Sequence, residues 1–180
     1  MQPTLASHRL TLRPWTDQDA ETVLDMYSRL EVMRYIGRTP MLITDLAQAQ
    51  ALIQRWQTLA TDKPYGAWAI VARGSSAAVG NALLKILPAS GSGEPSADTE
   101  VGWHLHPDVW GRGYATEAGR RLLELAWQNG LDKVFAVTNP ANAASQAVCA
   151  RLGMSALGLT DAYYDATCSL FVTPNPAAAA

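Results

Sequence analysis

The residues best suited to chemistry lie at positions 110–117, where two glycines separated by one residue precede an expected helix. Gly111 and Gly113 permit a tight turn with exposed backbone amides. The expected strand over residues 99–106 ends before this turn, because Pro107 fixes its own φ and donates no ladder hydrogen bond. A helix that begins from such a turn presents unpaired N–H groups and a partial positive charge. This pattern predicts a binding site for the phosphate of a cofactor.

Several kinds of site share a Gly-x-Gly turn, and the surrounding residues separate them. A P-loop ends in Gly-Lys-Ser/Thr, a run that this chain lacks. A dinucleotide-binding turn has a third glycine where Thr116 stands, and an acidic residue after the next strand, where residues 134–138 supply none. A coenzyme A pyrophosphate needs an amide-rich turn and a strand beside which the pantetheine arm can lie. A plain strand-to-helix connection and an unrelated α/β nucleotide-binding fold remain the alternatives.

The segment His106-Pro-Asp-Val-Trp-Gly-Arg-Gly-Tyr-Ala-Thr-Glu-Ala118 resembles the acyl-CoA-binding motif of the GNAT superfamily of N-acyltransferases. This motif, Gln/Arg-x-x-Gly-x-Gly/Ala, maps onto residues 110–115, with Trp110 in place of the usual Gln or Arg. Trp-Gly-x-Gly is similar to the Rim-type branch, which contains the ribosomal-protein N-terminal acetyltransferases. Three further segments resemble this branch: Arg9-Leu-Thr-Leu-Arg-Pro-Trp15, Glu100-Val-Gly-Trp103, and a last motif made of Asn142-x-x-Ser145 followed by Arg151-Leu-Gly-Met154. Four motifs in the right order are more specific than any one alone.

The resemblance implies an α/β, single-domain GNAT-like fold, in which helices flank a twisted mixed β-sheet with a splayed parallel strand pair at the cofactor site. It implies acetyl-CoA as co-substrate and no metal. The reaction it implies moves the acetyl group to a primary amine, of a protein N-terminus or a small molecule, by direct attack in a ternary complex. A non-catalytic CoA-binding sensor or scaffold with the same fold is the alternative. The residues expected at the cofactor are His104, Leu105, His106, Trp110, Gly111, Arg112, Gly113, Tyr114, Ala115, Thr116 and Asn142.

Acyl transfer from a thioester to an amine requires a neutral amine and a proton for the leaving thiolate. Neutralising a lysine-like amine at pH 7 costs about 4–5 kcal/mol, whereas a peptide α-amine costs only about 1 kcal/mol. Glu100 is the candidate base, because desolvation can raise the pKa of a carboxylate in a half-buried strand beside a cofactor cleft. Ser145, in the first turn of a helix capped by Asn142, is the candidate acid for the departing sulfur. In the resembled branch a glutamate at this position often orients a water or the amine, and a serine is proposed as the acid.

Each candidate also has a structural alternative. Glu100 could instead cap a neighbouring element or pair with an arginine, and Ser145 could only help to cap its helix. His104 and His106 share the face of Glu100, and His104 could line the acceptor site. These two histidines lack a third ligand at metal spacing, and the two cysteines fit no metal spacing. We therefore expect no metal and two buried thiols.

Length and composition set the remaining expectations. The chain of 180 residues predicts one domain over residues 1–173, followed by a flexible tail over 174–180. The net charge of −2 argues against general nucleic-acid binding, which usually needs a basic patch. The first residues do not resemble a signal peptide, and no apolar stretch approaches the roughly 20 residues that span a bilayer. We expect a cytoplasmic monomer or homodimer whose partner is the amine acceptor, with no membrane contact.

Hydrophobic periodicity predicts the elements that carry these residues. Strands are expected over residues 9–13, 67–72, 78–87, 99–106, 134–137, 156–159 and 167–172. Helices are expected after Thr16, from about Thr44, over 115–129 and over 143–152. The region 89–98 is rich in glycine, serine and proline, and we expect it to be a mobile loop. Glu117 and Arg121 are expected to form an i,i+4 ion pair.

Overall fold

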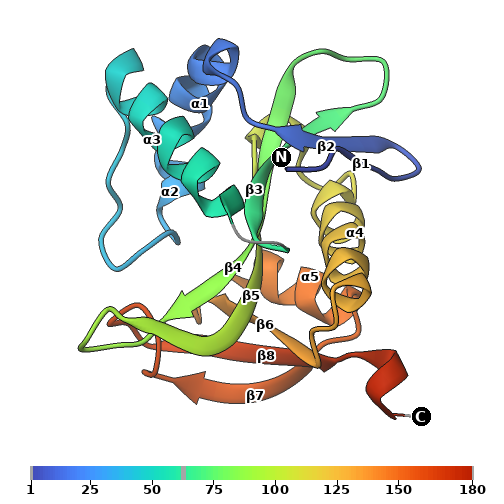
Figure 1. Cartoon of the computed structure of the whole chain (residues 1–180). Helices are drawn as coiled ribbons and strands as arrows, with labels where there is room; N and C mark the ends of the chain where they lie inside the picture. The colour runs from blue at the N-terminus through green and yellow to red at the C-terminus, as the bar shows by residue number, and fades with distance from the viewer. Residues whose placement is uncertain (1, 62–63, 180) are drawn as a thin grey trace.

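The computed structural model describes residues 2–61 and 64–179, and Figure 1 shows their arrangement. Within this part of the chain, eight strands form one mixed sheet in the order β1-β2-β3-β4-β5-β6-β8-β7. The strands are β1 (Leu5–Ala6), β2 (Leu10–Pro14), β3 (Gly66–Ala72), β4 (Ala78–Pro88), β5 (Pro95–Leu105), β6 (Lys133–Thr138), β7 (Ser155–Thr160) and β8 (Cys168–Pro174). The α-helices are α1 (Ala20–Tyr27), α2 (Leu30–Met33), α3 (Leu46–Thr58), α4 (Tyr114–Gln128) and α5 (Ala143–Arg151). Short 3-10 helices cover Asp17–Asp19, Leu59–Thr61, Pro107–Val109 and Pro176–Ala179.

Helices cover both faces of the sheet, so the core has two layers (Figure 1). On one face, α1 and α3 bury Val23, Met26 and Ile53 against strands β3 and β4, and α2 adds Val32. On the opposite face, α4 packs on the sheet through the apolar stripe expected from the sequence. The stripe residues are all buried: Ala115, Ala118, Leu122, Leu125 and Ala126. The expected α/β architecture with helices on both faces is confirmed.

The helices begin at residues whose side chains can satisfy free backbone amides. Thr16 forms a capping box with Asp19 before the 3-10 turn that leads into α1. Asp45 caps α3, and its carboxylate accepts a hydrogen bond from the backbone N–H of Gln48 at 2.9 Å. Both helix starts agree with the sequence expectation to within a few residues.

Strands β5 and β6 are the parallel pair that the fold prediction required, and they separate along their length. In the described chain their ladder holds one register pair, Glu100 with Phe135, whereas β5 pairs with β4 over most of its length. The backbone N–H of His106 donates to Val79 of β4 at 2.9 Å. Because backbone groups alternate along an antiparallel ladder, those of Trp103 and Leu105 face away from β4, toward the opening beside β6. The splayed parallel pair is confirmed.

Two local expectations are wrong. The region 89–98 is not one loop, because Pro95–Leu105 forms β5 and the preceding turn is closed by a 2.9 Å hydrogen bond from Ala89 N to Glu94 O. The turn also contacts a distant segment, since Ser90 N donates to Ala162 O at 2.8 Å. Glu117 does not pair with Arg121.

The partners of these two helix residues explain why the i,i+4 pair is absent. Arg121 binds Glu124 at 3.3 Å, whereas Glu117 turns toward the β1–β2 connection and binds Arg9 at 2.7 Å. The backbone amide and the guanidinium of Arg9 both donate to Glu117, and together they outcompete one solvent-exposed i,i+4 contact.

The described part of the expected tail is attached to the domain through Asn175. Its backbone N–H donates to Asp132 O at 2.7 Å, and its side-chain amide donates to Leu131 O at 3.0 Å. Pro174 itself belongs to β8 and pairs with Lys133. Flexibility beyond this point stays a prediction. Among the described helices, none combines the length and apolar character needed to cross a bilayer.

Candidate active site

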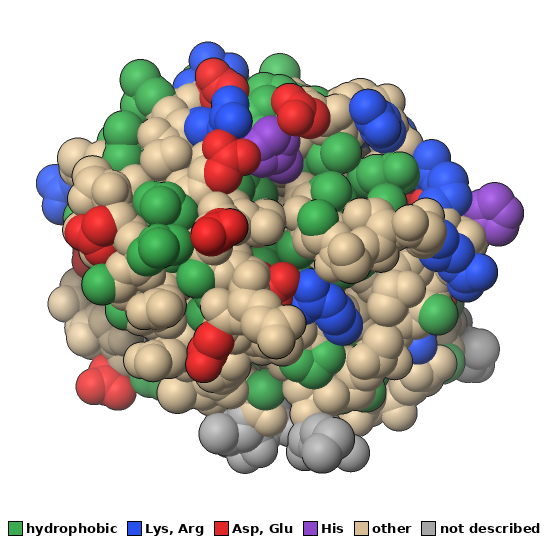
Figure 2. All heavy atoms as spheres, turned by 90° about the horizontal axis from the view of Figure 1, so that it is seen from above, with side chains coloured by type: hydrophobic (Ala, Val, Ile, Leu, Met, Phe, Trp, Pro, Cys, Tyr) green, Lys and Arg blue, Asp and Glu red, His purple; other side chains and the backbone are tan. Residues whose placement is uncertain are grey.

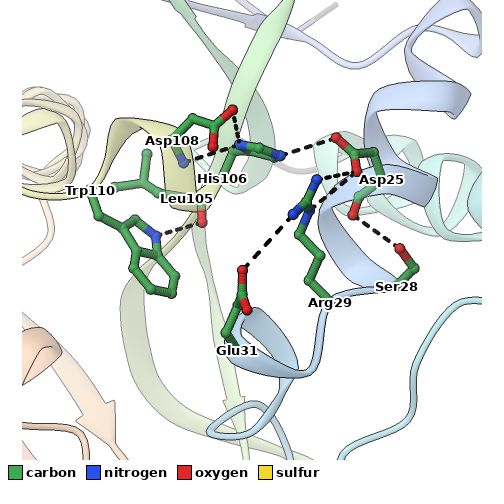
Figure 3. Close-up of polar contacts among 8 residues, drawn as sticks. All are labelled: Asp25, Ser28, Arg29, Glu31, Leu105, His106, Asp108 and Trp110. Atoms are coloured by element: carbon green, nitrogen blue, oxygen red, sulfur yellow. Dashed lines mark hydrogen bonds and ion pairs between the residues drawn. The ribbon is translucent and has the colours of Figure 1, made fainter.

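The glycine turn lies at the carboxyl end of β5, where the chain passes from the strand into α4. Gly111 and Gly113 both adopt left-handed backbone conformations, with φ of 74° and 78°. The indole N–H of Trp110 donates to the carbonyl oxygen of Leu105 at 2.8 Å, which closes the connection (Figure 3). This contact gives Trp110 a structural role at the position where the motif usually has Gln or Arg. It also occupies one of the carbonyls that face the opening between β5 and β6.

The amides of this turn are free to bind a ligand. Within the described residues, the backbone N–H groups of positions 111–116 donate to no carbonyl or side chain. They lie at the amino end of α4, a 15-residue helix whose dipole adds partial positive charge there. A phosphate is the ligand that such amides bind best. The amide-rich turn that the sequence predicted is therefore present.

A cluster of polar contacts fastens the turn to the β1–β2 connection. Arg9 donates through its backbone N–H and its side-chain Nε to the carboxylate of Glu117, at 2.6 and 2.7 Å. The same guanidinium donates to the carbonyl oxygen of Arg112 at 2.9 Å, and Ser7 Oγ donates to Glu117 at 2.7 Å. Partial burial opposes ionisation of Glu117, but the hydrogen bonds from Arg9 and Ser7 hold its pKa below the ordinary value.

An open depression of about 350 Å³ lies beside this cluster. Arg151 Nε donates to Thr116 Oγ1 at 3.2 Å at its edge, so basic side chains border the first turn of α4. The lining residues are His8, Arg9, Gly113, Thr116, Glu117, Arg120 and Arg151. On the face drawn in Figure 2, charged side chains are scattered among larger uncharged areas, and several basic side chains lie along the right edge.

Glu100 is buried on β5, at the register pair where β5 and β6 begin to separate. Its side chain accepts a hydrogen bond from the hydroxyl of Tyr164 and lies 3.8 Å from Lys85 Nζ. Burial raises the pKa of the Glu100 carboxyl, while Lys85 and Tyr164 act in the opposite direction. The arginine partner of the structural alternative is not found among the described residues. A lysine and a tyrosine stand in its place, so the carboxylate is both buried and partnered.

Tyr164 reaches Glu100 from a loop with an unusual backbone. Tyr164 and the following Asp165 have φ of 62° and 52°, in the left-handed region that non-glycine residues rarely adopt. The turn between β4 and β5 holds this conformation. Gly91 N donates to Asp165 Oδ1 at 2.6 Å, and Asp165 N donates to Ser90 Oγ at 3.0 Å. Backbone strain that is held in place beside a buried carboxylate is typical of a functional site.

His104 on β5 and His106, which directly follows the strand, both contact α1. His104 is half-buried, and its Nδ1 lies 2.9 Å from the hydroxyl of Tyr27. Burial lowers the pKa of His104 to about 4, so its ring is neutral at pH 7. His106 Nε2 lies 3.0 Å from Asp25, and its Nδ1 accepts from the backbone N–H of Asp108 at 3.2 Å (Figure 3). The His106 ring therefore links α1 to the turn.

The amino end of α5 lies at the carboxyl end of β6, on the other side of the opening. Asn142 caps the helix as expected, and its side chain accepts from the backbone N–H of Ser145 at 3.1 Å. The cap thus uses the amide of Ser145, and its Oγ has no partner within the described residues. Thr138, at the end of β6, likewise has a buried hydroxyl with no hydrogen-bond partner in the described chain. Two hydroxyls are therefore available at this end of β6.

The remaining expectations concern metals and thiols. Cys149 and Cys168 are free and buried, as expected, and burial raises the pKa of Cys149 to about 12. Within the described residues, no group of three His, Cys, Asp or Glu side chains could hold a metal ion. Tyr164, Lys85 and Tyr27 were not selected from the sequence. The signal for Lys85 was its position as the one charged residue in an apolar strand.

Comparisons with known proteins agree with this geometry. The model of the Acetyltransferase (GNAT) domain matches residues 9–155. An uncharacterised N-acetyltransferase of Bacillus subtilis, YoaA, is 29% identical over 164 residues, which cover 91% of this chain and 89% of that protein. The FsC-acetyl coenzyme A-N(2)-transacetylase of Aspergillus fumigatus is 31% identical over 159 residues, which cover 86% and 66%.

Solved structures resemble the whole chain. A GNAT-family acetyltransferase from Bacillus anthracis superposes with a TM-score of 0.77 at 19% identity, covering 96% of this chain and 99% of that one. RimJ of Mycobacterium smegmatis, in complex with CoA-disulfide, gives a TM-score of 0.77 at 18% identity, covering 96% and 88%. At these identities the likeness concerns the fold.

Proposed function

Because this chain belongs to the GNAT acetyltransferase family, we propose that it moves an acetyl group from acetyl-CoA to a primary amine by direct attack in a ternary complex. The observation that carries the proposal is the opening between β5 and β6. A buried, partnered carboxylate lies where the opening begins, and a turn with free amides lies where it ends. Strand β5 therefore supplies a candidate base, and the turn that follows it supplies a candidate phosphate site.

The cofactor is proposed to bind along this opening. The pyrophosphate is placed on the amides of residues 111–116, and the pantetheine arm runs beside the backbone groups of Trp103 and the backbone N–H of Leu105, because the carbonyl of Leu105 is taken by Trp110. RimL has been solved with coenzyme A and the microcin self-immunity acetyltransferase MccE with acetyl-CoA, and both share this fold. The side chains of His104 and His106 contact α1, so the proposal assigns them no contact with the cofactor arm.

The proposed chemistry balances within the site. The amine nitrogen attacks the thioester carbonyl carbon, the new C–N bond forms, and the C–S bond breaks. Glu100 takes the proton that the nitrogen loses, either directly or through a water molecule. Ser145 donates its hydroxyl proton to the leaving thiolate and is reprotonated by water, while Glu100 returns its proton to solvent, so both groups are restored. Free amides at the opening of a sheet can also stabilise the oxyanion that forms during the attack.

The acetyl acceptor is tested with a panel of amines. Purified protein is incubated with acetyl-CoA and amino acids, dipeptides, polyamines or aminoglycosides, and both free thiol and acetylated product are measured. Acetylation of any amine well above the rate of the buffer control supports the proposed activity. Binding of acetyl-CoA by calorimetry without turnover of any amine supports the alternative, a CoA-binding module that carries no reaction.

We expect Arg9→Met to weaken acetyl-CoA binding by about threefold to tenfold in calorimetry. The substitution removes the hydrogen bond that holds the Arg112 carbonyl, and it leaves the Glu117 carboxylate without its cation beside the phosphate site. Arg73→Met is the matched control, because Arg73 donates to Ser7 O of the same connection at 2.6 Å without touching the turn. Equal losses in both variants would show that the connection as a whole matters, and not the contact with the turn.

We expect Ser145→Ala to lower the turnover number by about tenfold or less. Water can protonate a thiolate whose own pKa is near 8.5, so loss of the hydroxyl is partly compensated. The cap on α5 survives, because Asn142 accepts from the backbone N–H of Ser145 and not from its hydroxyl. Steady-state kinetics with a reactive acceptor measures the effect. An unchanged turnover number at every pH would remove Ser145 from the mechanism.

A further inference from the structure

We infer that Lys85 is a specificity-determining residue that makes this enzyme favour weakly basic α-amines over lysine-like amines. The inference rests on the proposed function, and it names the acceptor class for the same site. Its basis is the ion pair that Lys85 forms with the candidate base, Glu100.

The register of the sheet places this pair on the face that α1 partly covers, which we take as the acceptor side. Lys85 and Glu100 are directly opposite each other on β4 and β5, and His104 is opposite Asn81 on the same strands. Residues two apart on a strand share a face, so all four side chains lie on one face of the sheet. Helix α1 covers part of this face, because Tyr27 contacts His104 there. Lys85 Nζ also lies over the ring of Tyr164, 4.8 Å from its centroid.

Lys85 already gives the Glu100 carboxylate a positively charged partner before any acceptor binds. The groups that face it are Lys85, the hydroxyl of Tyr164 and the thiol of Cys168, and burial raises the pKa of both the Tyr164 hydroxyl and the Cys168 thiol. His104 is neutral at pH 7 on the same face. The pair Lys85–Glu100 therefore has no net charge.

The acidic residues around this face are engaged as well. Asp98 accepts a 2.7 Å hydrogen bond from Tyr163 and lies 3.9 Å from Lys133. Asp161 accepts from Thr167, and Asp165 accepts from the backbone of Gly91. Asp98 therefore has a cation beside it, and hydrogen bonds hold the carboxylates of Asp161 and Asp165 against Thr167 and Gly91.

An acceptor that arrives as an ammonium ion must therefore meet Lys85 beside the carboxylate it needs. Like charges a few ångströms apart in a partly buried site repel strongly enough to change affinity by tenfold or more. An amine can avoid the repulsion by losing its proton first. A peptide α-amine, with a pKa of about 7.7–8.0, does so at small cost, whereas a lysine-like amine, near 10.4, does not. The position of Lys85 thus separates amines by basicity.

The test uses one acceptor that carries both amines, the peptide Lys-Ala-Ala amide, with acetyl-CoA at pH 7. Tandem mass spectrometry gives the ratio of Nε-acetyl to Nα-acetyl product, which equals the ratio of the two kcat/KM values. We expect the natural enzyme to acetylate mainly Nα. Lys85→Met should raise the Nε to Nα ratio by about tenfold, and Lys85→Arg, which keeps the charge, should leave it near the natural value. Any change in the basicity of Glu100 affects both products alike and cancels in the ratio.

Lys133→Met is the matched control. Lys133 also lies near a carboxylate of β5, Asp98 at 3.9 Å, and over an aromatic ring, that of Phe135 at 5.2 Å. This variant should leave the product ratio unchanged.

An unchanged ratio in folded Lys85→Met, or a natural enzyme that acetylates only strongly basic amines of the panel, overturns the inference. If the peptide is inert, the ratio is measured with a weakly basic amine that reacts and a strongly basic amine of equal size. Failure of every amine in the panel instead refutes the proposed function.

Discussion

Replacement of Glu100 by glutamine should lower the turnover number by about 10²–10⁴ and leave the affinity for acetyl-CoA nearly constant. Glutamine keeps the size of the side chain, and its carbonyl oxygen can still accept the hydrogen bond from Tyr164. The change therefore removes basicity with little change of shape. Steady-state kinetics with a reactive acceptor gives the turnover number, and calorimetry gives the cofactor affinity.

The pH dependence of kcat/KM in the natural enzyme should reflect the ionisation of the Glu100 carboxyl group. Burial raises the pKa of Glu100 above its ordinary value of 4.5. A general base works only when it is ionised, so kcat/KM should fall as the pH drops through this raised value. The fall should be absent in Glu100→Gln. His104 cannot produce it, because burial lowers its pKa to about 4 and its ring is already neutral at higher pH.

Asp98 provides an internal control on the same strand. Its carboxylate accepts from Tyr163, and Lys133 is 3.9 Å away, so its partners are of the same types as those of Glu100. Asp98 is half-buried and lies two residues before the point where β5 and β6 separate. Asp98→Asn should keep near-natural activity. If Glu100→Gln also keeps it with a true acceptor, the carboxylate is structural, and Tyr164 and Tyr27 become the next candidates.

The turn that we propose as the cofactor site could be predicted from the sequence because local rules determine its conformation. Gly111 and Gly113 are required by positive φ, and Asn142 is required by the free amides at the start of α5. Each of these signals is contained within a few consecutive residues. The apolar stripe of α4 is equally local, and every one of its residues is buried. These elements agree with the structure to within a few residues.

The partners of Glu100 could not be predicted in this way, because they come from distant parts of the chain. Lys85 meets Glu100 only through the register between β4 and β5, and Tyr164 reaches it across 64 residues of sequence. The same reason explains the wrong pair on α4. An i,i+4 spacing suggested Arg121 as the partner of Glu117, but Arg9 lies closer in space although it is 108 residues away in sequence. Such contacts follow from topology, which periodicity alone does not define.

Gly113→Val is expected to reduce acetyl-CoA affinity by about tenfold or more, as measured by calorimetry. Gly113 has φ of 78°, a conformation that costs a residue with a side chain about 1–2 kcal/mol. A Cβ at this position would lie 3.4 Å from Arg9 Nη2, at the turn on which we propose that the pyrophosphate binds. Two branching methyl groups would extend further, so the phosphate would be held away from the helix end.

A control variant at the opposite end of the same helix distinguishes the effect of backbone strain from the loss of the phosphate site. Gly130 follows α4, also has φ of 78°, and has open space around its Cβ position. Gly130→Val should therefore lose as much thermal stability as Gly113→Val and still bind acetyl-CoA with natural affinity. Equal binding by the two variants would mean that the pyrophosphate does not lie on this turn. A loss confined to Gly113→Val requires close approach of the cofactor to the backbone there, because the strain is common to both and only the position differs.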